Sequence, residues 1–345
     1  MSTSDLTATP DTCFWGHLDP DVPATRTVES GTEVWIEAVT HHAGDAPDLL
    51  MDAGVEAIWA GIPEADRGPG VHIMTGPIDV AGAQPGDTLR VEILEMRPRL
   101  PYGSNCAANW GLLYDRMVKE RITIYELVDP PAVGFPATAR PKFGFDFTTL
   151  ESYDVPGVVT PPDPATRQPF SRDITVPVRP HLGVMGVAPD SRVSSIPPGV
   201  FGGNVDNWRF GPGATVHYPV FREGAGFYVG DPHFSQGDGE ICGTAIEASL
   251  DVRLRLSIAD DVTTTSPLLR TDTHWFAHGF GDDLDAAMAM AADLALRLLV
   301  DRGGFTVDEA YSLASVAVDF GITQVVDGTV GCHAAVADAL LLPSR

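Results

Sequence analysis

The sequence predicts a mostly β fold, sandwich-like or barrel-like, with a smaller C-terminal α+β region. The chain of 345 residues contains 35 Gly and 29 Pro without low-complexity segments, which indicates many turns and short strands. Several segments alternate apolar and polar residues, the pattern of half-buried strands. Helix-forming composition is concentrated after residue 281.

The predicted strands share one pattern, in which a turn leads into alternating residues. Three of them follow Gly turns, at 30–37, 85–92 and 212–219. In the second, Leu89, Val91 and Ile93 fall on one face, so that face is expected to be buried. Residues 251–258 repeat the same alternation and are expected to form a fourth strand.

Two helices and one strand are expected near the C-terminus. Residues 282–300 are rich in Ala, Leu and Met, contain no Gly or Pro, and end before a Gly pair. Thr306 and Glu309 have the spacing of a capping box, which predicts a helix over about 307–320. Residues 322–326 are then expected to form a strand.

We therefore expect a β-rich domain over 1–260 and an α+β region over 261–345 that completes the fold. The Pro-rich segment 126–180 interrupts the first part. Its prolines indicate a surface insertion, with a lid over a site as the alternative.

Composition excludes several classes of protein. There are 22 Lys+Arg against 47 Asp+Glu, and a net charge of −25 disfavours nucleic acid and anionic membranes as partners. No stretch has the length of a membrane span, and no secretory signal is visible, so a cytoplasmic protein is expected. The cysteines form no C-x-x-C pair, which disfavours a disulfide scaffold: Cys13, Cys106, Cys242 and Cys332.

The densest cluster of polar residues lies within 202–247. Asp231 and His233 fall on one face if they occupy a strand, where carboxylate and imidazole ligate a divalent metal such as zinc. Glu240 or Asp238 is then placed to act as general base toward a metal-bound water.

Other interpretations of this cluster stay open. Residues 236–240 also suit a hairpin turn, whereas the spacing of a calcium loop is absent. Cys242 reads as a small buried residue, with a thiol nucleophile paired to His233 as the alternative. The chain contains no G-x-S-x-G elbow.

The sequence resembles the acetamidase/formamidase family. The resemblance rests on Gly-Asp-Pro-His-Phe-Ser-Gln-Gly-Asp-Gly-Glu at 230–240, Gly-Gly-Asn-Val-Asp at 202–206, and Thr-Gly-Pro-Ile at 75–78. Supporting motifs occur in the family's order at 183–189, 243–247 and 309–313.

The resemblance implies an amidase that hydrolyses short linear carboxamides, such as formamide or acetamide, to carboxylate and ammonia. It also implies a homo-oligomer, a dimer or trimer, and a divalent metal, zinc rather than calcium. The positions that match the family motifs are His72, Asn204, Asp206, Asp231, His233, Gln236, Asp238 and Glu240.

Amide hydrolysis requires an activated water, a polarised carbonyl and a proton for the leaving amine. The expected metal ligands are Asp231, His233 and His72. The expected catalytic residues are Glu240, Asp238 and Gln236. The expected substrate-binding residues are Asn204, Asp206, His181 and Cys242; His181 is included because it precedes the Gly-rich segment 183–189.

Two further functions are carried as alternatives. One is a lactamase or other amidase of the same family. The other is a non-catalytic protein that binds an amide or a sugar. His41, His42 and Asp45 are compatible with two interpretations: additional metal ligands or substrate contacts, or a solvated loop. His274 and His278 are interpreted as structural.

Overall fold

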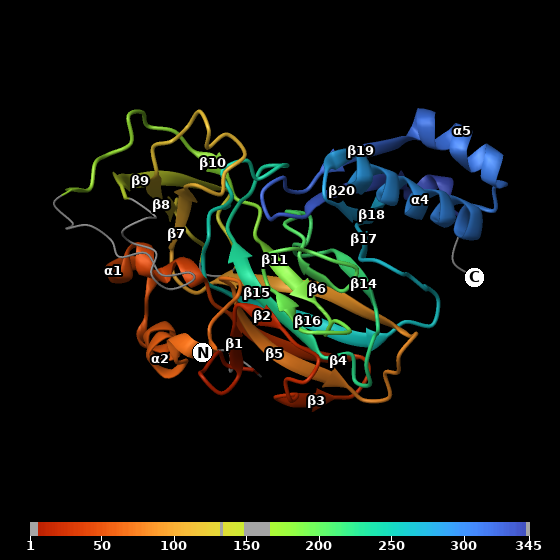
Figure 1. The fold of residues 1–345 in the computed structure, drawn as a ribbon, viewed down its shortest axis with the longest axis horizontal. Helices are drawn as coiled ribbons and strands as arrows, with labels where there is room; N and C mark the ends of the chain where they lie inside the picture. The colour runs from red at the N-terminus through yellow and green to blue at the C-terminus, as the bar shows by residue number, and fades with distance from the viewer. Residues whose placement is uncertain (1–5, 132–133, 148–165, 343–345) are drawn as a thin grey trace.

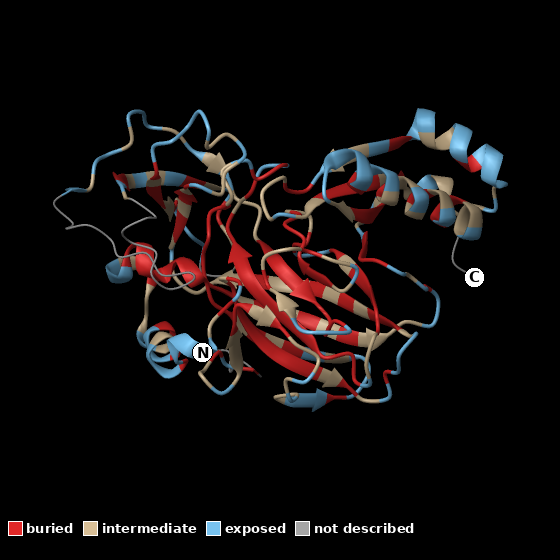
Figure 2. Cartoon of the chain, viewed as in Figure 1, coloured by how far each residue is buried: buried red, intermediate tan, exposed pale blue. Residues whose placement is uncertain are grey.

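The computed structural model describes residues 6–131, 134–147 and 166–342. Two large sheets pack against each other at the centre of the molecule (Figure 1). Val34 and Leu254 from one sheet share a buried cluster with Leu182 and Val229 from the other. Figure 2 shows that buried residues are concentrated in these central strands. The fold is therefore mostly β, as predicted.

The larger sheet has eight strands in the order β19-β20-β18-β17-β14-β6-β16-β4. Its strands are β4 (Thr32–Ala38), β6 (Thr88–Pro98), β14 (Thr215–Pro219), β16 (Leu250–Ile258), β17 (Leu268–Arg270), β18 (His274–Gly281), β19 (Val318–Ile322) and β20 (Val330–Ala337). All four strands predicted from turn-and-alternation patterns lie in this sheet, and Leu89, Val91 and Ile93 are buried together as expected.

The second sheet positions most of the candidate site. It has six strands, in the order β1-β5-β15-β11-β13 with β3 paired to β5. Their bounds are β1 (Cys13–Trp15), β3 (Arg26–Val28), β5 (Ile73–Val80), β11 (His181–Gly186), β13 (Gly202–Asn204) and β15 (Phe227–His233). A two-stranded ribbon accompanies it, made of β2 (His17–Leu18) and β12 (Val193–Ser194).

The Pro-rich segment 126–180 contributes to a third sheet, in the order β10-β9-β8-β7. Its strands are β7 (Tyr102–Ala107), β8 (Arg121–Leu127), β9 (Thr138–Asp146) and β10 (Val176–Pro177). The prolines at both ends of this segment thus flank or join regular strands. The surface insertion or lid was predicted over the whole of 126–180, and residues 132–133 and 148–165 of this segment lie outside the described residues.

The helices occupy the two ends of the molecule (Figure 1). At one end are η1 (His41–Asp45), α1 (Pro47–Leu50), α2 (Ala53–Gly61) and η2 (Glu64–Asp66). At the other end are α4 (Leu284–Gly303), α5 (Val307–Ala317) and the short η4 (Asp338–Leu340). In the described part of the chain, no helix has the length and apolar character needed to cross a membrane.

Both predicted C-terminal helices form, and their ends follow local chemistry. Asp283 caps α4 by accepting a hydrogen bond from Ala286 N, and Gly304 ends it in a left-handed conformation at φ 73°. The predicted capping box of Thr306 and Glu309 is present at the start of α5.

The predicted end of α5 and the following strand were wrong. The helix ends at Ala317 rather than near residue 320, and the strand covers 318–322 rather than 322–326. Val318 pairs with Val336 of β20, and this antiparallel pairing overrides the helical pattern. Residues 323–327 are thereby released to form a loop beside the candidate site.

The division of the chain into two parts at residue 260 stays a prediction. In the structure, β17–β20 continue the sheet of β4, β6, β14 and β16.

Candidate active site

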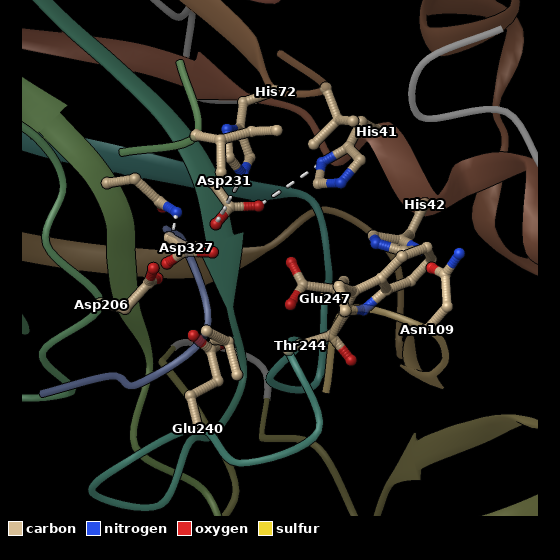
Figure 3. Close-up of a pocket in the computed structure, with 16 residues that line it drawn as sticks. His41, His42, His72, Asn109, Asp206, Asp231, Glu240, Thr244, Glu247 and Asp327 are labelled. Carbon is tan, nitrogen blue, oxygen red and sulfur yellow. Dashed lines mark hydrogen bonds and ion pairs between the residues drawn. The ribbon is translucent and has the colours of Figure 1, made fainter. Parts of the chain in front are cut away.

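A cavity of about 380 Å³ gathers side chains from distant parts of the chain (Figure 3). η1, the start of β5, β15, and the loops that follow β13, β15 and β19 each contribute to its lining. The polar lining includes His41, His42, His72, Asp231, Glu247 and Asp327. The third sheet lies at the edge of this cavity through the loop after β7, which supplies Asn109 and Trp110.

Asp231 and His233 lie side by side on β15, as their spacing predicts. The His233 Nε2 is 3.0 Å from Asp231 Oδ2 and 3.0 Å from Glu247 Oε2. Burial alone would lower the pKa of His233, but the charges of Glu247 and Asp231 raise it well above its usual value. In this structure a His233 imidazolium therefore joins the two carboxylates.

Two further histidines face Asp231 (Figure 3). His41 Nδ1 is 3.5 Å from Asp231 Oδ1, and His72 Nε2 is 3.8 Å from Asp231 Oδ2. The other nitrogen of His72, Nδ1, donates to the main-chain carbonyl of Ser195 at 3.0 Å. That hydrogen bond fixes the tautomer and leaves a lone pair on Nε2 directed at Asp231.

This arrangement fits a divalent cation. Burial lowers the pKa of His72 and, together with His42 and His72, lowers that of His41 well below its usual value, so both rings are neutral. Within the described residues, neither His41 Nδ1 nor Asp231 Oδ1 makes a hydrogen bond, although both are buried. Buried acceptors without partners are rare, and neutral imidazole with carboxylate is the donor set that zinc takes. The ligand atoms of His41, His72 and Asp231 all lie within 4.8 Å of one another.

A second cluster, of three carboxyl side chains, faces the His41–His72–Asp231 cluster across the cavity. Its members are Asp206, Glu240 and Asp327. Figure 3 shows Asp206 and Asp327 on one side, with Glu247 and His42 on the other. Burial and the charge of Asp231 raise the pKa of Asp206 to about 8. Burial and the charge of Asp206 raise the pKa values of Glu240 and Asp327 well above their usual range. These carboxyl groups therefore keep their protons to a higher pH than free carboxyl groups do.

The carboxylates of the site rest on unusual backbone. Asp206, Asp231 and Glu240 have φ values of 50°, 47° and 43°, in the left-handed region that non-glycine residues seldom adopt. Such conformations persist where surrounding contacts hold them, and they are concentrated at functional sites. In these conformations, three acidic side chains from different elements point into one cavity.

Behind the cavity, a chain of hydrogen bonds supports His233. Its Nδ1 lies 3.0 Å from His181 Nε2, and His181 Nδ1 donates to the Arg179 carbonyl at 2.7 Å. Burial and the charge of His233 lower the pKa of His181 to about 3, so it is a neutral acceptor. Gln236 lies beside the same ring and is fixed by its amide Nε2, which donates to the Asp206 carbonyl at 2.6 Å. His181 and Gln236 thus support the site from behind instead of lining it.

The sequence profile described as the Acetamidase/Formamidase family matches residues 6–195 and 191–343. The chain belongs to this family.

Curated relatives agree with that membership. The chain is 32% identical over 262 residues to an acetamidase of Mycolicibacterium smegmatis, an alignment covering 66% of this chain and 61% of the relative. It is 27% identical over 277 residues to a formamidase of Methylophilus methylotrophus, covering 69% and 62%. The matched region thus spans about three fifths of the length of these relatives.

Solved structures share the fold over nearly the whole chain. A crystal structure of an acetamidase from Yersinia enterocolitica has a TM-score of 0.76 at 24% identity, covering 97% of this chain and 92% of its own. An acetamidase from Bacillus halodurans gives 0.73 at 24% identity, with 96% of both chains covered. A gamma lactamase from Delftia acidovorans gives 0.57 at 20% identity, with 97% and 93% covered.

Within this acetamidase/formamidase fold, Gly183 of β11 permits the close approach of the site's strands. A Cβ at this position would lie 2.6 Å from Asp206 Oδ1, from Asp231 Oδ2 and from His233 Cε1. Only a residue without a side chain fits there. The Gly-rich segment 183–189 therefore contributes to the site by the space it leaves.

Asp238 was predicted to be catalytic, and the structure places it elsewhere. Its side chain is 44% exposed and pairs with Arg209 at 2.9 Å. It also accepts a hydrogen bond from Trp208 Nε1 at 2.8 Å. The turn at 237–239 directs Asp238 outward and Glu240 inward, so these two acidic residues do not share the site.

Cys242 also lies outside the main cavity. It lines a separate cavity of about 170 Å³, and Asn105 Nδ2 donates to its Sγ at 3.3 Å. Both ring nitrogens of His233 already have partners in Asp231, Glu247 and His181. The structure therefore does not form the Cys242–His233 pair that a thiol mechanism requires.

The sequence reasoning missed Glu247 and Asp327 and left His41 and His42 undecided. Glu247 ends the family motif at 243–247, which was a usable signal, whereas Asp327 lies in an ordinary Asp-Gly turn. His42 Nδ1 donates to Asp45 at 2.9 Å, and Ser104 Oγ donates to the same carboxylate oxygen at 2.5 Å. A histidine followed three residues later by an aspartate was the local signal for this buried pair.

Proposed function

We propose that the protein is an amidase that hydrolyses carboxamides to carboxylate and ammonia. The observation that carries this proposal is the buried pair His41 Nδ1 and Asp231 Oδ1, which make no hydrogen bond in the described residues and share a cavity with Glu240, whose pKa is raised. Family membership and the acetamidase and formamidase relatives support it.

In this proposal His41, His72 and Asp231 hold a zinc ion. The sequence also indicated His233 as a ligand, but both of its ring nitrogens bond to Asp231, Glu247 and His181, so its proposed role is to orient Asp231. Zinc, when bound, lowers the pKa of water and polarises a carbonyl oxygen. The hydrogen bond of His72 to Ser195 and the contact of His233 with His181 fix the orientation of the ligands.

Proton transfer falls to Glu240. Water adds its oxygen to the amide carbon, and the carbon–nitrogen bond breaks as the nitrogen gains a proton. Glu240 is buried, lines the cavity, and has a raised pKa, so it can carry a proton from the attacking water to the leaving nitrogen. The products are a carboxylic acid and ammonia.

Asn204 and Asp206 are the proposed contacts of the amide NH₂ group. Both line the cavity, and Asn204 Oδ1 and Asp206 Oδ1 are buried without hydrogen bonds in the described residues. Asn204 is fixed by donating through Nδ2 to Asp327 Oδ2 at 3.1 Å. Two oriented acceptors suit the two hydrogens of a primary amide.

The test compares ammonia release from formamide, acetamide and a γ-lactam by the zinc-loaded and chelated protein. Zinc-dependent release is expected, and Glu240→Gln should lose at least about 100-fold in kcat. Asp238→Asn is the matched control, because that carboxylate is on the surface, and it should keep full activity. Ligand-induced thermal stabilisation without turnover of any amide would instead indicate a non-catalytic binding protein.

The family resemblance also implies a homo-oligomer, a dimer or trimer, and we keep this as a proposal. Light scattering of the purified protein would measure the molar mass and test it.

A further inference from the structure

We propose that the preferred substrates are neutral, apolar primary carboxamides larger than acetamide, with an aliphatic chain of several carbons or an aromatic acyl group. This inference rests on the proposed amidase function and names the substrate class of the same site. It follows from the size of the cavity, the composition of its walls and its charge.

The cavity is larger than a small amide needs. Its volume is about 380 Å³, whereas a water molecule takes a share of about 30 Å³ in the liquid. The space therefore holds on the order of a dozen water-sized groups. Acetamide has four non-hydrogen atoms, so it would leave most of the cavity filled with water.

Three aliphatic side chains stand next to the polar centre. Val71 precedes His72, Val326 precedes Asp327, and Ile196 follows the serine that holds His72. All three line the cavity and are half-buried, whereas His72 is buried. An amide group seated among the ligands therefore has apolar surface available for its acyl chain toward the opening.

Trp110 supplies an aromatic wall of the same cavity. Its indole lies directly against Gly243, where any Cβ would overlap the ring, and the next residue, Thr244, also lines the cavity. Gly243 has φ +88°, so this backbone favours glycine for a second reason. A flat, half-buried indole provides a surface on which an aromatic or aliphatic acyl group packs.

The charge of the lining restricts the acyl group further. Five carboxyl side chains face the cavity, and no Lys or Arg among the described residues lines it: Asp206, Asp231, Glu240, Glu247 and Asp327. An acyl chain that ends in a carboxylate would lose its hydration in the cavity and would find no Lys or Arg side chain in the described part of the lining to pair with. Neutral acyl groups are therefore expected to bind better than anionic ones of the same length.

The experiment measures kcat/KM of the zinc-loaded full-length protein for acetamide, hexanamide, benzamide and succinamic acid. Hexanamide and benzamide should exceed acetamide by about 10-fold or more, because each buried methylene contributes to transition-state binding. Succinamic acid should fall below acetamide.

Variants connect this preference to the walls. Trp110→Ala should lower the ratio of kcat/KM for benzamide over acetamide by about 10-fold. Val326→Ala should lower the ratio for hexanamide over acetamide by about 5-fold, and it tests the proposal independently if the tryptophan variant does not fold. Leu112→Ala is the control, since this side chain is 52% exposed on the same loop as Trp110 and should leave both ratios unchanged.

The outcomes separate the two proposals. Turnover of acetamide at or above the rate of hexanamide and benzamide would overturn the substrate class while supporting the amidase. Unchanged ratios in both wall variants would also overturn it. Absence of turnover with every amide, in folded and zinc-loaded protein, would overturn the amidase function itself.

Discussion

His72 faces Asp231 with a lone pair, Nε2 to Oδ2 at 3.8 Å, because its other ring nitrogen is held by the carbonyl of Ser195. Two acceptors directed at each other in a buried site repel unless a proton or a cation lies between them. Burial keeps His72 neutral, which favours the cation. This relationship makes metal content the most direct readout of the site.

Replacing His72 with Gln should abolish metal retention. The variant loses the imidazole donor while keeping a polar side chain of similar size, and loss of one ligand lowers affinity steeply. Zinc per chain, measured by elemental analysis after dialysis, should fall from near one to well below one half. His274→Gln serves as the control, since His274 lies on β18 away from the cavity and bonds to Thr273. Equal zinc in wild type and His72→Gln would contradict the proposed ligand set.

Gly183→Ala should strongly reduce the proposed amidase activity while the fold persists. The added methyl group would come within 2.6 Å of the carboxylates of Asp206 and Asp231, so these must move. A displacement of this size costs on the order of 100-fold in kcat/KM. Circular dichroism and ammonia release would be compared with Gly237→Ala, where nothing lies within 4 Å of the new Cβ. Similar activity of the two variants would show that the close approach at Gly183 is not needed.

Asp206→Asn should stabilise the metal-free protein increasingly as pH rises. The folded pKa of Asp206 is about 8 because of burial and the charge of Asp231, against 3.8 for the free group. Between these values the folded state binds more protons than the unfolded state, so the wild-type unfolding free energy falls with rising pH. The loss is at most about 1.4 kcal/mol for each pH unit in that window.

The measurement is urea unfolding in the presence of a chelator at pH 5 and pH 8. Asn keeps the shape of the side chain and tolerates the φ of 50° at this position. The advantage of Asp206→Asn over wild type should be larger at pH 8. An equal difference at both pH values would show that Asp206 is ionised in the folded state.

Thr306→Ala should destabilise the protein by about 1 kcal/mol. The Thr306 Oγ1 accepts from Glu309 N, and the Glu309 carboxylate accepts from Thr306 N at 2.9 Å, so both capping bonds depend on this residue pair. Thermal or urea unfolding reports the change. Ser312→Ala on the exposed face of the same helix is the control and should stay within about 0.5 kcal/mol of wild type.

The sequence predicted the parts of this molecule that local chemistry determines. The alternation in 251–258 and the Thr306–Glu309 capping box each appear in the structure because residues within one turn or strand decide them. The spacing of Asp231 and His233 likewise brings their side chains together.

Long-range pairing determined what the sequence did not predict. The strand over 318–322 replaced the end of a helix because β20 offers it a partner, a fact that no local pattern contains. Asp327 enters the cavity on the loop that this shift creates, so the local sequence did not predict its position either. Asp238 and Glu240 are two residues apart and equally acidic, yet the turn between them sends one to Arg209 and the other to the cavity.

The cavity takes His41 from near the beginning of the chain and Asp327 from near its end, on loops that follow β4 and β19, the two edge strands of the eight-stranded sheet. During synthesis, Asp327 therefore joins the cavity only after nearly the whole chain has left the ribosome. A chain that ends before residue 327 would lack one acidic side chain in the wall of this cavity. If the cavity binds zinc as proposed, the site that receives the metal is therefore complete only late in synthesis.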